Sequence, residues 1–91
     1  MTPEEKRLAE KRVRNADQAQ AVLDNPAFQR AVEQIDREVI EEWKATSPNA
    51  REDLEELKRL YHSFHTFITL FKSAIIEGDF DAQKLRDSLT H

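Results

Sequence analysis

The sequence predicts one small all-α domain, and three observations lead to this prediction. Apolar residues recur at helical spacing along most of the chain. The 91 residues include one glycine and three prolines, which leaves few positions for sharp turns. Charged residues make up 35% of the chain, as is common for surface helices. We therefore expect an antiparallel helical hairpin at residues 26–77, preceded by a light N-terminal helix at residues 1–24 and followed by a short C-terminal helix at residues 79–91.

The N-terminal helix has a well-marked start and few apolar residues. Thr2-Pro3-Glu4-Glu5 has the pattern of a capping box, with Thr2 at the N-cap, Pro3 at the first helical position and Glu5 at the third. The helix should run to about Asp24. Its narrow apolar stripe predicts only light docking on the rest of the protein. The stripe consists of Ala9, Val13, Ala16 and Leu23.

The second helix is amphipathic and should extend from about Pro26 to Ala45. Asn25 is disfavoured in helical geometry because it precedes proline, whereas Pro26 suits the first turn of a new helix. The break at residues 46–49 is short, so the next helix should fold back antiparallel. The apolar row of the second helix is formed by Phe28, Val32, Ile35, Val39 and Trp43.

The third helix, expected from about Asn49 to Glu77, is the most apolar part of the chain. Between Leu60 and Ile76 it carries one formal charge, Lys72. A helix with so little charge should be covered on more than one side. We therefore expect a homo-oligomer, most simply a dimer in which two hairpins form a four-helix bundle. The core or self-association residues of this helix are Leu54, Leu57, Tyr61, Phe64, Phe67, Ile68, Phe71 and Ile75.

Gly78 is expected to end the third helix, since glycine is the usual residue just beyond a helix C-terminus. Asp79 could then cap a short last helix. The apolar residues of that helix would fold back as a lid over the hairpin.

Charge is distributed unevenly along the chain, whose net charge is −4. A basic arm near the N-terminus and an acidic tip around the hairpin turn define two candidate contact surfaces. Solvated helix faces are the simpler interpretation of both, while the functional one is a basic partner for the tip. The basic arm has no interleaved aromatic residues, so nucleic-acid binding is disfavoured. The acidic tip comprises Glu38, Glu41, Glu42, Glu52, Asp53, Glu55 and Glu56, and the basic arm comprises Lys6, Arg7, Lys11, Arg12 and Arg14.

Catalytic and cofactor chemistry has no clear candidate in this sequence. The chain has no cysteine, its single glycine excludes a glycine-rich phosphate loop, and no serine stands in a nucleophile motif. We expect neither an enzyme nor a cofactor. His62 and His65 could share a helix face as metal ligands, but a position between core and surface is the favoured interpretation. The aromatic residues could line a small-molecule pocket, although simple packing is favoured. The weakly charged run at residues 60–76 is too short to span a bilayer, so no membrane contact is expected.

Four segments together resemble a group of short all-helical proteins of unknown function encoded by tailed bacteriophages and prophages. The segments are Leu23-Asp24-Asn25-Pro26-Ala27-Phe28, Ile40-Glu41-Glu42-Trp43-Lys44-Ala45-Thr46, Arg51-Glu52-Asp53-Leu54 and Ile76-Glu77-Gly78. The resemblance covers most of the chain and lies in the order and spacing of plain motifs. It implies a phage context near genes for particle structure and assembly, and it brings no catalytic residues.

The leading hypothesis is a non-enzymatic structural or assembly component of a phage particle. It would act by self-association or by docking onto a larger phage protein, in the host cytoplasm or in the particle. One alternative is a small phage inhibitor that binds and blocks a host defence protein through the acidic tip. A weaker alternative is a DNA-packaging or regulatory factor that uses the basic arm on phosphate.

Overall fold

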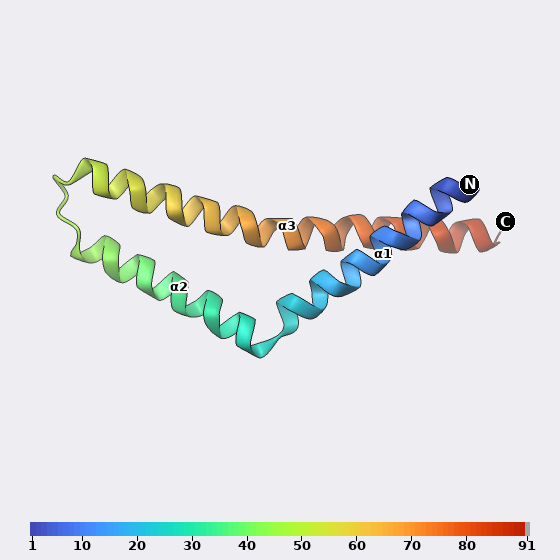
Figure 1. The fold of residues 1–91 in the computed structure, drawn as a ribbon, viewed down its shortest axis with the longest axis horizontal. Coiled ribbons are helices and arrows are strands. Elements are labelled where there is room, and N and C mark those ends of the chain that lie inside the picture. Colours follow the sequence, from blue (N-terminus) through green and yellow to red (C-terminus); the bar gives the residue numbers. More distant parts are fainter. Residues whose placement is uncertain (91) are drawn as a thin grey trace.

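The computed structural model describes residues 1–90 of the chain and confirms an all-α fold. Its three helices are α1 (Pro3–Asp24), α2 (Pro26–Ala45) and α3 (Arg51–Thr90) (Figure 1). α3 contains 40 residues and therefore extends for about 60 Å. That length nearly matches the longest dimension of the molecule, which measures 63 × 26 × 16 Å. α1 and α2 follow opposite halves of α3, so the start of α1 and the end of α3 lie at one end of the molecule and the α2–α3 loop lies at the other (Figure 1).

The starts of α1 and α2 are those predicted from the sequence. The Thr2 hydroxyl oxygen accepts a hydrogen bond from the Glu5 backbone N–H at 3.1 Å, as an N-cap does. Asn25 is extended, with φ −68° and ψ 122°, because a residue before proline avoids the helical region. Its side-chain oxygen accepts from the backbone N–H groups of Ala27 at 2.8 Å and Phe28 at 3.2 Å. Asn25 therefore ends α1 and caps α2.

The predicted helix end at Gly78 and the separate helix from Asp79 are wrong, because α3 continues through both residues to Thr90. Gly78 has no positive φ and so does not adopt the left-handed conformation of a helix C-terminus. Instead it is buried against α1. A Cβ built at position 78 would lie 2.1 Å from the Ala16 Cβ and 3.0 Å from the Arg12 carbonyl oxygen. Glycine is required here by the close approach of two helices.

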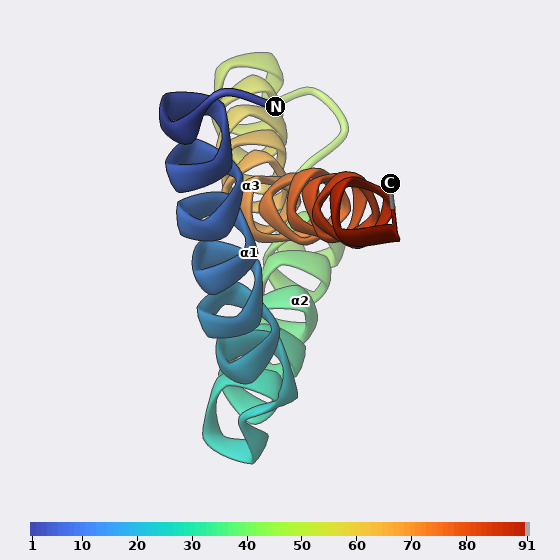
Figure 2. The same cartoon turned by 90° about the vertical axis from the view of Figure 1, so that its right-hand side faces the viewer.

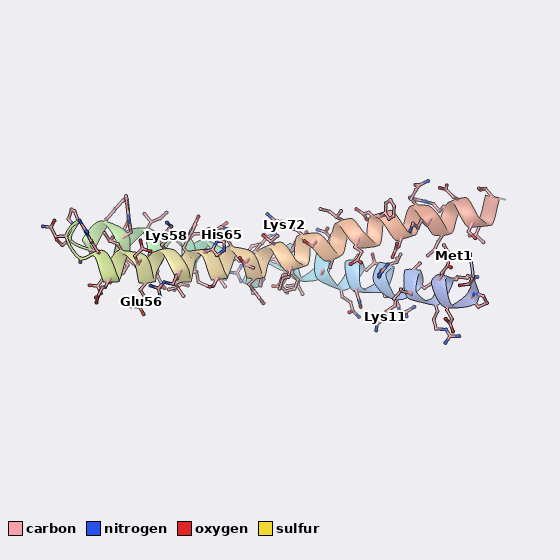
Figure 3. The ribbon with its side chains drawn as sticks, turned by 90° about the horizontal axis from the view of Figure 1, so that it is seen from above. Met1, Lys11, Glu56, Lys58, His65 and Lys72 are labelled. Atoms are coloured by element: carbon pink, nitrogen blue, oxygen red, sulfur yellow. The ribbon has the colours of Figure 1, made fainter. Side chains whose placement is uncertain are left out.

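The predicted light docking of the N-terminal helix is also wrong, since α1 and α3 form the closest helix pair in the molecule. The two helices cross in Figure 1 and lie next to one another in Figures 2 and 3. Within residues 1–90, the buried apolar side chains are Ala9, Ala16 and Ala19, all on α1. Small side chains let two backbones approach closely, so a thin apolar stripe is sufficient for this contact. The prediction failed because it judged docking from the amount of apolar side chain.

After the loop at residues 46–50, α3 runs back past α2. The backbones of α2 and α3 nevertheless stay further apart than those of α1 and α3. Figure 1 shows α2 leaning away from α3 toward the α1–α2 corner. Large side chains reach across the space between them. Near the corner, the rings of Phe28 and Phe71 meet edge to face with centroids 5.9 Å apart. Phe67 packs in the same way on Phe71, at 5.2 Å.

Candidate interaction surface

Two apolar grooves lie between α2 and α3. The first, the Trp43 groove, has a volume of about 400 Å³ and is lined by Val39, Ile40, Trp43, Leu54, Glu55, Leu57, Lys58 and Tyr61. The second, the Leu60 groove, is lined by Ile35, Glu38, Val39, Glu42, Leu57, Leu60 and Phe64. They share Val39 and Leu57 and otherwise use different residues. The two grooves therefore open on opposite sides of the α2–α3 pair.

Large apolar side chains stand exposed along these grooves. Trp43 is 61% exposed and Leu60 is 58% exposed, one on each groove. Of the residues predicted to form the core or a self-association face, none is fully buried. Phe28, Val32, Val39, Leu54, Leu57, Phe64, Ile68, Phe71 and Ile75 are half-buried, whereas Ile35, Trp43, Tyr61 and Phe67 are exposed. The α2–α3 side chains thus pack on each other and leave much of their apolar surface uncovered.

A polar pair, Asp36 and His65, also bridges α2 and α3. The Asp36 Oδ1 and His65 Nε2 atoms are 3.4 Å apart. Both atoms are buried, and within residues 1–90 neither has a hydrogen bond of good geometry. The His65 ring also packs on the Tyr61 ring, with centroids 4.2 Å apart. Sequence reasoning missed this pair, because it searched for carboxylates within one helical turn of the histidines and Asp36 comes from another helix.

The two histidines, for which a position between core and surface was favoured over metal binding, have different surroundings. His65 is half-buried beside Asp36, whereas His62 is exposed on α3. Across residues 1–90, histidine, aspartate and glutamate side chains nowhere gather in a group of three or more that could hold a metal ion. The histidine that the structure places in a defined environment is therefore His65.

All seven residues of the acidic tip are exposed. They occupy the last part of α2 and the first turns of α3, at the loop end of the molecule. Within the tip, the Glu41 carboxylate lies 3.7 Å from the Lys44 ammonium. Figure 3 labels Glu56 near the loop end and Lys11 toward the opposite end, where Met1 lies. The acidic tip and the basic arm are thus widely separated along the molecule.

The five residues of the basic arm have two different roles. Lys6, Arg7, Lys11 and Arg14 are exposed on α1. Arg12 instead faces α3, where its guanidinium lies 3.2 Å from the Glu77 carboxylate and 3.4 Å from the Asp81 carboxylate. Asp81 is only 3% exposed. Arg12 therefore partners a buried carboxylate beside the Gly78 contact, and four of the five basic residues are free to meet solvent or a partner.

Comparisons with protein families, with curated proteins and with solved structures give no match to this chain. The resemblance to phage-encoded helical proteins therefore stays a prediction. Within residues 1–90, none of the helices contains an apolar stretch long enough to cross a membrane.

Proposed function

We propose that the protein is a non-enzymatic association protein whose binding surface is the α2–α3 pair with its two apolar grooves. The resemblance to phage-encoded helical proteins supports a more specific role, as a structural or assembly component of a phage particle. The acidic tip lies next to both grooves and would orient a partner that carries basic residues. Such steering acts on the rate and specificity of association more than on its strength.

The observation that carries this proposal is the large surface of the isolated chain. Its accessible area is 7450 Å². A folded monomer of 10.7 kDa should expose roughly 5,500 Å², according to the scaling of area with mass. The radius of gyration is 19.2 Å. A compact domain of this length should have a radius of gyration of about 12 Å.

The excess area of roughly 2,000 Å² includes apolar side chains that compact monomers usually cover. Apolar area removed from water stabilises a complex by about 25 cal/mol per Å² before the costs of association are subtracted. A partner that covers even part of the apolar groove surface would therefore gain binding free energy. The α2–α3 pair is a surface suited to a partner.

The proposal is tested in cells that produce particles of the encoding phage or prophage. Tagged protein should co-sediment with particles or assembly intermediates on a density gradient. The double variant Trp43→Ser/Leu60→Ser should remain at the top of the gradient, because it removes an apolar side chain from each groove. Ile76→Ser is the matched control, since Ile76 is 70% exposed on α3 and lines neither groove.

Wild-type protein that stays at the top of the gradient throughout particle production would contradict the assembly role. Co-sedimentation that the double variant retains would contradict the assignment of the binding surface to the grooves. Binding of the wild-type protein to a purified host defence complex, with inhibition of that complex and no particle association, would instead favour the inhibitor alternative.

A further inference from the structure

The Trp43 groove carries a protruding side chain beside the hollow that could receive it. Trp43 is 61% exposed at the edge, and Leu54, Leu57 and Tyr61 of α3 form the opposite wall. A two-fold interface requires one patch that complements itself, because each copy presents the same residues. A ridge and a hollow within one patch meet this requirement. Exposed tryptophan and tyrosine are also the residue types enriched at interface centres.

The charged residues of the same groove have opposite signs. Glu55 and Lys58 both line it, and they lie one turn apart on α3. A two-fold axis that crosses α3 at right angles between residues 56 and 57, within the groove, would run α3 of one copy antiparallel to α3 of the other. Each residue then faces the position on the other side of the axis, so that Glu55 of each copy meets Lys58 of the other. A parallel arrangement would place like charges together instead.

The available area is enough for such a pairing. A specific protein interface of ordinary size covers about 800 Å² on each partner. The chain exposes roughly 2,000 Å² more than a compact monomer of its mass. One groove and its surroundings can therefore be covered without any change in the α1–α3 contact.

We propose that a second copy of this chain occupies the Trp43 groove in a closed two-fold dimer, with the two α3 helices antiparallel. Trp43 of each copy enters the groove of the other, and Glu55 pairs with Lys58 across the axis. This inference rests on the proposed association function and names its first partner. The Leu60 grooves of both copies remain open on the outside of the dimer for a further protein.

Sedimentation velocity on single variants tests which groove is used. Trp43→Ser should weaken the dimer by at least about tenfold, as expected for an aromatic anchor at an interface centre. Leu60→Ser and Ile76→Ser remove side chains of similar exposure outside the groove and should leave the dissociation constant within about threefold. Circular dichroism should show the same helix content in all three variants, since each residue is largely exposed. Dissociation by Leu60→Ser and not by Trp43→Ser would overturn the proposal.

A charge exchange tests the orientation and the identity of the partner. Glu55→Lys alone and Lys58→Glu alone should each weaken the homodimer by at least about tenfold, because like charges then face each other twice. The double variant Glu55→Lys/Lys58→Glu should dimerise as the parent does. A mixture of the two single variants should form a heterodimer in preference to either homodimer. Single variants that dimerise as well as the parent would overturn the antiparallel arrangement.

Failure of this inference differs from failure of the proposed function. A wild-type chain that stays monomeric at high micromolar concentration, yet co-sediments with particles through its grooves, overturns the dimer and leaves the association function intact. A wild-type dimer that never associates with particles supports the dimer and contradicts the assembly role.

Discussion

Gly78→Ala should destabilise the protein, although alanine is the better helix former. Ordinary carbon–carbon contacts are about 3.5–4.0 Å long, whereas the new Cβ would lie 2.1 Å from the Ala16 Cβ. It would also lie 3.0 Å from the Arg12 carbonyl oxygen, which is backbone and cannot rotate away. α1 and α3 must therefore separate. Overpacking of this kind costs about 1–3 kcal/mol, while exchanging glycine for alanine in a helix gains about 0.5–1 kcal/mol.

We expect a net loss of about 1–2 kcal/mol, and thermal unfolding followed by circular dichroism should show a melting temperature lower by roughly 5–15 °C. The control is the double variant Ala16→Gly/Gly78→Ala, which removes the Cβ that clashes. It should melt above Gly78→Ala alone, because substitutions at two residues in contact are not additive. A Gly78→Ala protein that melts at or above the parent temperature would refute the close α1–α3 contact.

Two further predictions concern contacts between helices. Phe71→Ala should lower the free energy of unfolding by about 2–4 kcal/mol, since the half-buried Phe71 ring packs on rings from α2 and α3. Phe80→Ala is the control, and it should lower the free energy of unfolding by less than about 1 kcal/mol because Phe80 is 63% exposed. Equal urea midpoints for these two variants would contradict the packing of α2 on α3. Arg12→Gln should lower the free energy of unfolding by about 1–3 kcal/mol, because it leaves the Asp81 carboxylate buried without its cation. Lys11→Gln, on the exposed face of α1, is the control and should change that free energy by less than about 0.5 kcal/mol. A thermal melt of Arg12→Gln that matches that of Lys11→Gln would show that the buried carboxylate does not need Arg12.

The sequence was a good guide to local structure because helix ends depend on neighbouring residues. Thr2 and Asn25 cap α1 and α2 as their side chains and the following prolines predict. The extent of α2 also follows from its apolar period and from the break after Ala45. Each of these features is determined within a few residues of the chain.

Contacts between distant segments could not be predicted in the same way. Glycine after a long helix usually marks an end, and only the approach of Ala16 from α1 explains why Gly78 continues α3. The paired residues Arg12 and Asp81 are 69 positions apart in the chain. Each stands among other charged residues, so the sequence does not mark either one as part of a buried pair. The sequence signals for the α1–α3 contact were small residues, namely Gly78 on α3 and the alanines Ala9, Ala16 and Ala19 on α1.

The grooves were anticipated only in part. The low charge of residues 60–76 predicted that the third helix needs covering on more than one side, and its exposed apolar residues are consistent with that need. The sequence could not show that a groove opens on each side of the α2–α3 pair, because the separation of two helices depends on the size of every side chain between them.

The central claim, that a second copy covers part of this open chain, is tested most directly by small-angle X-ray scattering of the wild-type protein. Forward scattering gives the mass and the low-angle region gives the radius of gyration. We predict a mass twice that of the 10.7 kDa chain at micromolar concentration, decreasing toward one chain on dilution. A mass of one chain at all concentrations would contradict the claim. A radius of gyration near the roughly 12 Å of a compact domain would then show that the chain closes on itself instead.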